Sequence, residues 1–366
     1  MTVCLSHLSL SHFRSHRRAE LRVEEGPIAI FGPNGAGKTN LIEAVSLLSP
    51  GRGLRRAISE DLARRPDNVG WRVDATIDTD AGPISVQLRA EPGTSRKVVI
   101  DDQSAPQTAL GHLLRLVWLV PSMDRLWIEG ADGRRRFLDR TALSFFPDHA
   151  QATLEYEKAM RERNRLLKDQ VHDPHWYGAL ESQMAIAGLQ VHENRKATVA
   201  RLQAAQDEAA GPFPTASLSL VQSEGTMPTD VDEMKSVYAD GRRADMAAGR
   251  TRIGPHRSDL KGVYAAKGVA AEMCSTGEQK ALLLSLILAN AHAIKADTGT
   301  PPIMLLDEVA AHLDADRRAA LYDQIWQLGA QAWMTGTGAE LFAELGDRAQ
   351  RFEVRETDGQ SEVTQQ

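Results

Sequence analysis

Alternation of apolar and polar residues predicts strands at the start of the chain. Residues 8–14 alternate in the manner of an edge strand, and residues 21–24 alternate as well. Residues 28–31 are uniformly apolar, which is typical of a buried strand, and residues 40–45 begin a helical pattern. This part of the chain therefore predicts strand, strand, strand, loop and helix in that order.

A second β region follows. Residues 71–77, 84–88 and 97–101 alternate with turn signals between them, which predicts an antiparallel meander with one face toward water. A further apolar run at 113–120 ends at Pro121.

Helical patterns dominate the middle of the chain. Between about residues 150 and 210 apolar residues lie among charged ones, and a break at 172–174 separates two helices. The second helix carries a narrow apolar stripe, formed by Trp176, Leu180, Met184, Ala187 and Val191. This spacing predicts a seam against a partner helix, and the pair predicts an antiparallel arm or helical insert. Residues 216–220 and 230–248 then fit a strand and a helix.

The most informative stretch joins the buried strand at 28–31 to the helix at 40–45. Its residues fit G-x-x-x-x-G-K-[ST] at every fixed position: Gly32, Pro33, Asn34, Gly35, Ala36, Gly37, Lys38 and Thr39. Such a loop curls backbone N–H groups around a phosphate at a helix N-terminus. Lys38 would reach the β- and γ-phosphates, and the Thr39 hydroxyl would hold Mg²⁺. The alternative is a glycine-rich turn without a ligand, which the strand–loop–helix context disfavours.

A second apolar strand, at 302–306, ends in the carboxylates of Asp307 and Glu308. In a phosphate-loop enzyme Asp307 would hold Mg²⁺ through its water shell, and Glu308 would orient and deprotonate the attacking water. Two acids after an apolar strand are common by chance. The prediction therefore depends on sheet topology bringing this strand end to the loop that begins at Gly32.

A third candidate site precedes the apolar helix at 281–293. It consists of Ser275, Thr276, Gly277, Glu278 and Gln279. A hydroxyl and a glycine at a helix tip suit a second anion site. The alternative is a capping box, Ser275 with Glu278 or Thr276 with Gln279, and the residue types alone favour it.

Composition excludes several classes of protein. The chain has 366 residues, of which 42% are hydrophobic and 25% charged, as expected of a soluble globular protein of about two domains. The longest apolar run, 281–289, is about half the length that a membrane span needs, and residues 1–18 lack a signal-peptide pattern. Cys4 and Cys274 are expected to be free thiols in a cytoplasmic protein.

The net charge of −6 means that any nucleic-acid surface must be local. Arginines gather at Arg55 and Arg56 in a glycine-rich loop, and at Arg134, Arg135 and Arg136. Three adjacent arginines cannot share one helix face, so some must face solvent, a partner or nucleic acid. A solvated turn and a solvated helix start are the alternatives at these two places.

The stretch at 249–260 is dense in glycine, proline and cations, and it contains His256. No second metal ligand lies near this histidine in the sequence. A buried or hydrogen-bonded histidine is therefore favoured over a metal ligand.

Taken in order, residues 34–39, 275–279, 305–308 and 311–314 resemble the motifs of an ABC-type ATPase of the SMC kind. Residues 10–14, 134–139 and 254–260 narrow the resemblance to the RecF family of bacterial DNA repair ATPases, over about residues 5–345. The resemblance implies an α/β fold, an ABC-type P-loop ATPase head with mixed sheets and a helical insert. The expected domains are the N-terminal half of the head at 1–120, a mainly helical insert at 121–248, and the C-terminal half of the head at 249–366.

The resemblance also implies a homodimer that forms with ATP and Mg²⁺, its subunits facing head to tail around two nucleotides. Asn40 would join the loop in binding the nucleotide. The signature offered to the γ-phosphate on the partner subunit would comprise Ser275, Thr276, Gly277 and Gln279, with Asp314 at the same interface. ABC proteins usually have a histidine at the switch position. Here Thr335 or Thr337 would replace it, and the sequence does not decide between them.

Members of this family are expected to bind DNA at gaps or single/double-strand junctions, with slow, DNA-stimulated ATP hydrolysis as the release step. The partners that the resemblance implies are RecR, RecO and RecA, and no membrane. The alternatives are a P-loop kinase of small molecules, a transporter ATPase subunit, another SMC-like ATPase and a structural clamp with an inactive site.

Overall fold

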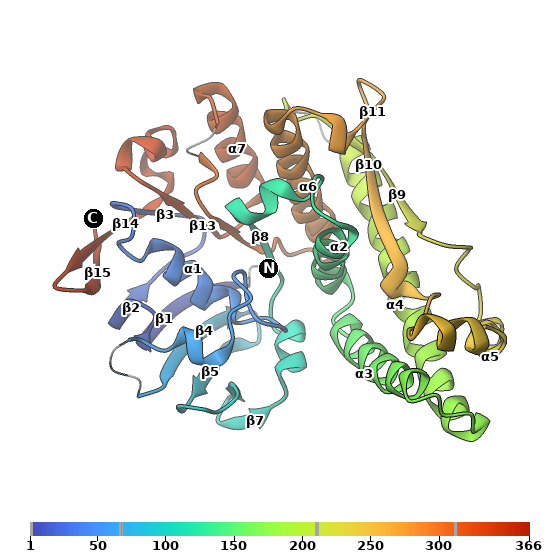
Figure 1. The fold of residues 1–366 in the computed structure, drawn as a ribbon. Coiled ribbons are helices and arrows are strands. Elements are labelled where there is room, and N and C mark those ends of the chain that lie inside the picture. The colour runs from blue at the N-terminus through green and yellow to red at the C-terminus, as the bar shows by residue number, and fades with distance from the viewer. Residues whose placement is uncertain (1–2, 66, 68, 209–211, 311–312) are drawn as a thin grey trace. The chain divides into compact units, whose positions relative to one another are not determined.

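The computed structural model describes residues 3–65, 67, 69–208, 212–310 and 313–366. The chain forms two compact units (Figure 1). The first unit contains residues 1–124, 208–213 and 283–366, and the second contains residues 125–207 and 214–282. Residues 249–282, which the sequence assigns to the head, lie in the second unit.

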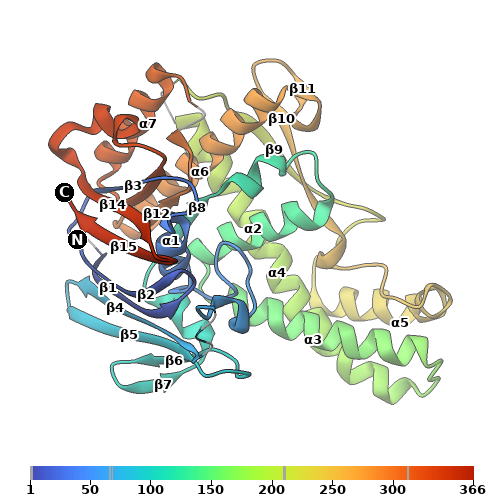
Figure 2. The same cartoon turned by 60° about the vertical axis from the view of Figure 1, so that its left-hand side comes forward.

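The first unit contains an antiparallel sheet in the order β2-β1-β4-β5-β6-β7, whose strands lie side by side in Figure 2. Its strands are β1 (Cys4–Phe13), β2 (His16–Arg22), β4 (Trp71–Thr79), β5 (Gly82–Ala90), β6 (Lys97–Ile100) and β7 (Gln103–Ala105). The predicted meander is confirmed in β4, β5 and β6. The prediction that the first strand is an edge strand is wrong, because β1 pairs with β2 on one side and with β4 on the other. One face of β1 is buried and the other is partly exposed, and this produces the alternation that was taken as the sign of an edge strand.

The second sheet of this unit has the order β15-β14-β3-β13-β12-β8. Its strands are β3 (Pro27–Phe31), β8 (Leu116–Leu119), β12 (Ile303–Leu306), β13 (Ala332–Gly336), β14 (Gln350–Thr357) and β15 (Gln360–Gln365). All neighbouring pairs are parallel except β14 with β15. The carboxyl ends of β3, β13 and β12 therefore meet at one edge of the sheet, where ligands bind in open α/β sheets.

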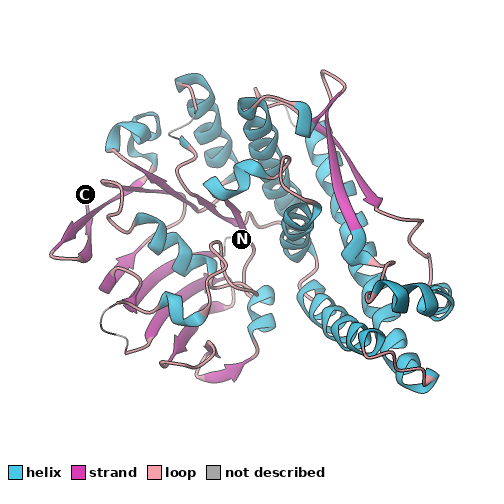
Figure 3. Cartoon of the chain, viewed as in Figure 1, coloured by secondary structure: helices cyan, strands magenta, loops and turns pink. Residues whose placement is uncertain are grey.

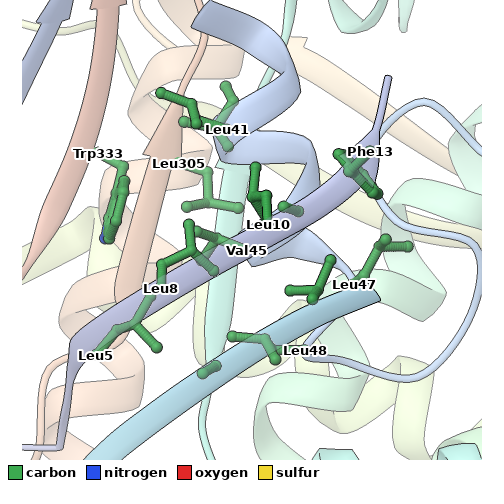
Figure 4. Packing of buried hydrophobic residues seen from close by; sticks show 14 of the residues in the cluster. Leu5, Leu8, Leu10, Phe13, Leu41, Val45, Leu47, Leu48, Leu305 and Trp333 are labelled. Carbon is green, nitrogen blue, oxygen red and sulfur yellow. The ribbon is translucent and has the colours of Figure 1, made fainter. Parts of the chain in front are cut away.

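The helix that follows β3 lies in the core of the first unit (Figure 4). Helix α1 (Lys38–Ser46) is buried from Leu41 to Ser46. Its side chains share one apolar cluster with residues of β1, β12 and β13, for example Leu10, Leu305 and Trp333. Because the helix is packed against both sheets, the loop before it is held at a fixed place. The other helical elements of this unit are η1 (Ser59–Leu62), η2 (Gln107–His112), α7 (Ala315–Leu328) and η7 (Ala339–Arg348).

The second unit is mainly helical, as Figure 3 shows, and it has a small antiparallel sheet in the order β11-β10-β9. Its helices are α2 (Ala131–Phe145), α3 (His149–Lys168), α4 (Pro174–Glu208), α5 (Val231–Ala248), η4 (Pro255–Arg257) and η5 (Ala271–Met273), and its strands are β9 (Ala216–Gln222), β10 (Ser258–Tyr264) and β11 (Val269–Ala270). The 3₁₀ helix η3 (Pro121–Arg125) and helix α6 (Thr276–Thr298) each cross the division between the units.

The two long helices predicted in the middle of the chain are α3 and α4, separated at residues 169–173. Met184 and Ala187 of α4 pack with Tyr156 of α3 and Tyr238 of α5, as the apolar stripe predicts. Trp176 is wrongly placed in that stripe, because it is 64% exposed. The stripe begins one position later, at the buried Tyr177, since the first turn of α4 carries Trp176 on its solvent side.

A buried arginine joins helices α3, α4 and α5 of the second unit. Arg163 of α3 donates hydrogen bonds to Glu181 of α4 (3.1 Å), to Asp245 of α5 (2.7 Å) and to the Tyr238 carbonyl (3.0 Å). Removing one partner from such a group leaves an uncompensated buried charge, so these pairs fix how the helices pack.

Candidate nucleotide site

The loop at residues 32–39 lies between β3 and α1 and has the backbone that a phosphate loop requires. Gly32, Gly35 and Gly37 have φ values of 150°, 84° and 104°, in the region that favours glycine. A Cβ at Gly32 would overlap the carbonyl oxygen of Val354 on β14, so this position has no room for a side chain. The glycines that the sequence motif requires therefore lie where the backbone of the loop needs them.

Lys38 is held over its own loop. Its ammonium donates hydrogen bonds to the carbonyls of Gly32 (2.8 Å) and Pro33 (2.9 Å), and the residue is 4% exposed. Burial lowers the pKa of Lys38, and the nearby carboxylates of Glu308 and Asp307 oppose that shift. These acids lie at the end of β12, so the structure brings the loop and the predicted acidic pair together.

A chain of hydrogen bonds links the ends of three segments far apart in sequence. The Thr39 hydroxyl donates to Asp307 Oδ1 at 3.0 Å, and the Thr335 hydroxyl donates to the same oxygen at 2.6 Å. The backbone N–H of Glu308 donates to the Thr335 hydroxyl at 3.0 Å. Thr335, at the end of β13, is therefore the central residue of this network. Thr337 is exposed, and the structure gives it no such contact.

Glu308 is one of the non-glycine residues with positive φ, at 53°. A non-glycine residue in this region costs free energy and persists where its surroundings hold it. Its N–H bond to Thr335 supplies part of that hold. The carboxylate of Glu308 is thus held near Lys38 by a constrained backbone. A fixed position of this kind is what a group that orients water would need.

A second layer of polar groups supports the loop from behind. His16 Nε2 lies 3.1 Å from the Gly37 carbonyl, and the Asn40 amide donates to the Ser15 hydroxyl at 2.7 Å. The Ser361 hydroxyl donates to the Ser15 hydroxyl at 2.6 Å. His16 is fully buried, and burial lowers its pKa. Sequence reasoning missed Ser15, His16 and Ser361, because no motif marks them and Ser361 comes from the distant β15.

Helix α1 also carries a buried acid beside the loop. Glu43 is fully buried and receives the Arg14 guanidinium in two hydrogen bonds, at 2.9 and 2.7 Å. Arg55 donates to Glu43 at 3.3 Å and to the Asn40 side chain at 2.8 Å. A lone arginine in a strand is usually solvated, but the guanidinium of Arg14 is bound to a buried carboxylate. Arg55 reaches the residue next to the loop, while Arg56 is exposed with φ at 56°.

The tip of α6 has the capping box that the residue types favour. The Ser275 N–H donates to Glu278 Oε2 at 2.8 Å, and the Glu278 N–H donates to the Ser275 hydroxyl at 3.4 Å. Lys267 pairs with Glu278, and this pair, together with Ser275, lowers the pKa of Glu278 to about 2. Thr276 and Gly277 are exposed at the tip.

The remaining two residues of the predicted partner-facing surface have structural contacts of their own. Gln279 is buried, and its amide donates to the Cys274 carbonyl at 2.8 Å. Asp314 caps α7 by accepting the Arg317 N–H at 2.8 Å, and it is exposed. Ala311 and His312, in the same predicted motif, lie outside the described residues.

The arginines of α2 are largely engaged within the second unit. Arg134 is 6% exposed and donates to Asp259 at 2.7 and 2.9 Å, and Arg135 donates to the Ser258 carbonyl at 3.0 Å. Arg136 pairs with Asp132 one turn earlier. These contacts favour a structural role for Arg134 and leave Arg135 and Arg136 only partly accessible.

The stretch at residues 254–260 also contains a side chain that is held by hydrogen bonds. The Tyr156 hydroxyl lies 2.6 Å from His256 Nδ1, and Nε2 lies 3.1 Å from the Thr251 carbonyl. Burial lowers the pKa of His256 to about 4, so the ring is neutral near pH 7. The expectation of a hydrogen-bonded histidine is confirmed. In the described part of the chain, groups of three or more metal-ligating side chains do not occur.

Among the described helices, we find none with the length and apolar character of a membrane span. Cys4 and Cys274 are free thiols, as expected.

Similarity to known proteins identifies the class of protein to which this fold belongs. The family model described as RecF/RecN/SMC N terminal domain matches residues 4–359. The head domain of an SMC protein from Pyrococcus furiosus matches with a TM-score of 0.58 at 17% identity, covering 100% of this chain and 96% of that one. The chain thus has the expected α/β fold of an ABC-type ATPase head with mixed sheets and a helical insert.

Two further matches are more specific. The DNA replication and repair protein RecF of Mesorhizobium japonicum is 44% identical over 362 residues, which cover 96% of each chain. A solved structure described as the recombination mediator protein RecF-ATPrS in the RecFOR pathway matches with a TM-score of 0.84 at 21% identity, covering 99% of this chain and 98% of that one. The chain belongs to the RecF family.

Proposed function

We propose that this protein is a weak, ATP-switched ATPase that binds DNA in recombinational repair and replication restart. The observation that carries the proposal is the network of Thr39, Asp307, Thr335 and Glu308 beside Lys38. Family membership and the match to a solved structure described as RecF-ATPrS support it.

Nucleotide binding would use the loop as it stands. Lys38 now contacts two carbonyls of its own loop, and phosphate oxygens offer the same ammonium stronger, charged acceptors. The N–H groups of the glycine-rich turn and of the first turn of α1 would hold the remaining phosphate charge. We therefore expect Lys38→Ala to abolish ATP binding.

The oxygens of Thr39 and Asp307 suit Mg²⁺, which prefers hard oxygen ligands. They lie 3.0 Å apart, so one cation bound there would replace their mutual hydrogen bond. When bound, Mg²⁺ would neutralise charge on the β- and γ-phosphates. Thr335 would keep its hydrogen bonds to Asp307 and to the Glu308 backbone, and would thereby position both acids.

Glu308 is the base in this proposal. Its carboxylate would accept a proton from the water that attacks the γ-phosphorus atom, and the bond from that phosphorus to the bridging oxygen of ADP would break. Lys38 would stabilise the charge that develops on the phosphoryl oxygens.

The complete site would require a second copy of the chain. The exposed tip of α6, with Ser275, Thr276 and Gly277, would face the γ-phosphate held by the partner, and the exposed Asp314 would lie at the same seam. Gln279 is buried, so it would support the tip from below. Ser275 would have to exchange the Glu278 carboxylate for a phosphate oxygen.

The DNA-related part of the proposal follows from the family. The ATP-bound homodimer would bind gapped or junction DNA in the cytoplasm and, with RecR and RecO, promote loading of RecA. Arg55, beside the loop, and the exposed Arg56 remain candidate DNA contacts, and Arg135 and Arg136 are weaker ones. Within the described residues, we find no observation that favours a small-molecule kinase.

The experiment that tests this function measures binding to gapped and to plain duplex DNA with and without ATP, alongside oligomeric state. Wild type is expected to bind gapped DNA only with ATP and as a dimer. Lys38→Ala is the matched control and should bind neither nucleotide nor DNA. ATP-independent DNA binding of equal strength by both proteins would contradict the proposal.

A further inference from the structure

The outer face of the antiparallel sheet carries a row of cations that no motif marks. In the strand register Ser11 of β1 lies opposite Arg18 of β2 and Arg72 of β4. Arg72 lies opposite Arg89 of β5, and Arg89 lies opposite Lys97 of β6. The cationic row is therefore Arg18, Arg72, Arg89 and Lys97, interrupted only by a serine.

All four cations point to the solvent side. The strands alternate, and the neighbouring residues Val73, Leu88 and Val98 are buried in the core beneath. The side chains of Arg18 and Arg72 are 82% and 51% exposed, and Arg89 and Lys97 are classed as exposed. Neighbouring strands lie about 4.8 Å apart, so a row across four strand gaps is roughly 19 Å long.

The charges of this row are only partly compensated by the next row of the same face. Asp74 accepts the Arg72 guanidinium at 2.7 Å, and Glu20 lies 3.9 Å from Arg18. Within the described part of the chain, the side chains of Arg89 and Lys97 have no hydrogen-bond or ion-pair partner. They border a hollow of about 250 Å³ together with Arg72, Trp71 and one acidic residue, Glu91.

The linear arrangement selects the kind of ligand. A small anion or a nucleotide is bound by donors that converge on one point, as in the loop at residues 32–39. Cations in a line over roughly 19 Å instead match a polyanion, and one DNA strand places a charge about every 3.4 Å along the helix axis. Such a row would contact phosphates without reading sequence.

We propose that the cationic row is a contact surface for the phosphate backbone of duplex DNA. The row is independent of the arginines of the loop at 49–56 and of α2. This inference rests on the proposed DNA-binding function, and it adds the surface that the DNA would contact.

The test measures DNA affinity of the full chain by fluorescence anisotropy with ATP, between about 50 and 200 mM salt. Each lost phosphate contact should reduce the slope of log K against log salt by about 0.9, so Arg89→Gln/Lys97→Gln should reduce it by about 1.8 and Lys97→Gln alone by about 0.9. Arg355→Gln/Lys196→Gln changes the net charge equally at exposed, paired residues elsewhere, and should leave the slope unchanged. Asp74→Asn releases Arg72 from its carboxylate and should strengthen binding, an effect that structural damage would not produce.

The outcomes separate this proposal from the proposed function. If wild type binds DNA with ATP and the row variants keep its slope, the cationic row is not the contact surface. If wild type does not bind DNA at all, the proposed function itself fails. The variants should retain wild-type ATP affinity, since their side chains do not contact the loop.

Discussion

Replacing Thr335 by valine should uncouple the acidic pair from its support. The two side chains have nearly the same shape, so the change removes a hydroxyl without opening a cavity. That hydroxyl donates to Asp307 at 2.6 Å and accepts the Glu308 N–H at 3.0 Å, in a position that is 1% exposed. Hydrogen bonds to charged groups contribute about 1.5–3 kcal/mol, and an orphaned buried N–H costs about 1–3 kcal/mol.

We expect Thr335→Val to lower the melting temperature and to slow ATP turnover. If the change loses about 2 kcal/mol from the positioning of Glu308, turnover falls roughly 30-fold, since each 1.36 kcal/mol is tenfold. ATP affinity should change much less, because Lys38 and the glycine turn are untouched. Steady-state phosphate release and binding of a fluorescent ATP analogue measure the two quantities.

Two matched variants make the result interpretable. Thr335→Ser keeps the hydroxyl and should retain most activity. Thr337→Val removes an exposed hydroxyl with no contact to the acids and should behave as wild type. Normal turnover in Thr335→Val, or a loss in Thr337→Val instead, would refute the assignment of Thr335 as the switch-position residue.

Three further predictions concern the loop and the second unit. Gly32→Ala should weaken ATP binding at least tenfold in a titration, because its Cβ would overlap the Val354 carbonyl; unchanged affinity would show that the loop tolerates the shift. Burial lowers the pKa of His256 from 6.5 to about 4. Between these two pH values the imidazole is protonated in the unfolded chain but not in the folded one. The free energy of unfolding should therefore fall as the pH drops from 6.5 to about 4, by up to about 3 kcal/mol. His256→Asn should flatten this part of the profile in denaturant melts, and an equally steep profile would assign the effect elsewhere. Arg134→Met removes two charged hydrogen bonds and leaves Lys261, at 3.5 Å, as the ion-pair partner of Asp259, so it should destabilise the protein by about 2 kcal/mol while leaving the salt dependence of DNA binding unchanged; a flatter slope would return Arg134 to the DNA surface.

Local sequence signals predicted the strand, glycine loop and helix at residues 27–46 well, because the constraints on this segment are local. The turn from β3 into α1 needs glycine at fixed offsets, and the order of apolar runs marks the strands on either side. The acidic pair was predictable for a related reason, since a buried strand that ends in Asp307 and Glu308 can meet the loop only through parallel pairing.

Long-range features were not predictable in the same way. The choice between Thr335 and Thr337 depends on strand pairing that places one hydroxyl beside Asp307. The bond of Arg14 to Glu43, the support of the loop by Ser361 and the cationic row all depend on register between segments distant in sequence. The edge assignment of β1 failed because alternation reports which face is buried and does not count strand neighbours.

The α6 tip of one copy of the chain is expected to complete the ATP site of another. The most direct measurement is the mass of Glu308→Gln by light scattering at saturating ATP. That variant keeps Lys38, Thr39 and Asp307 but lacks the base, so the account predicts a stable dimer that returns to monomer when ATP is removed. A Glu308→Gln protein that binds ATP fully and remains monomeric would contradict the account.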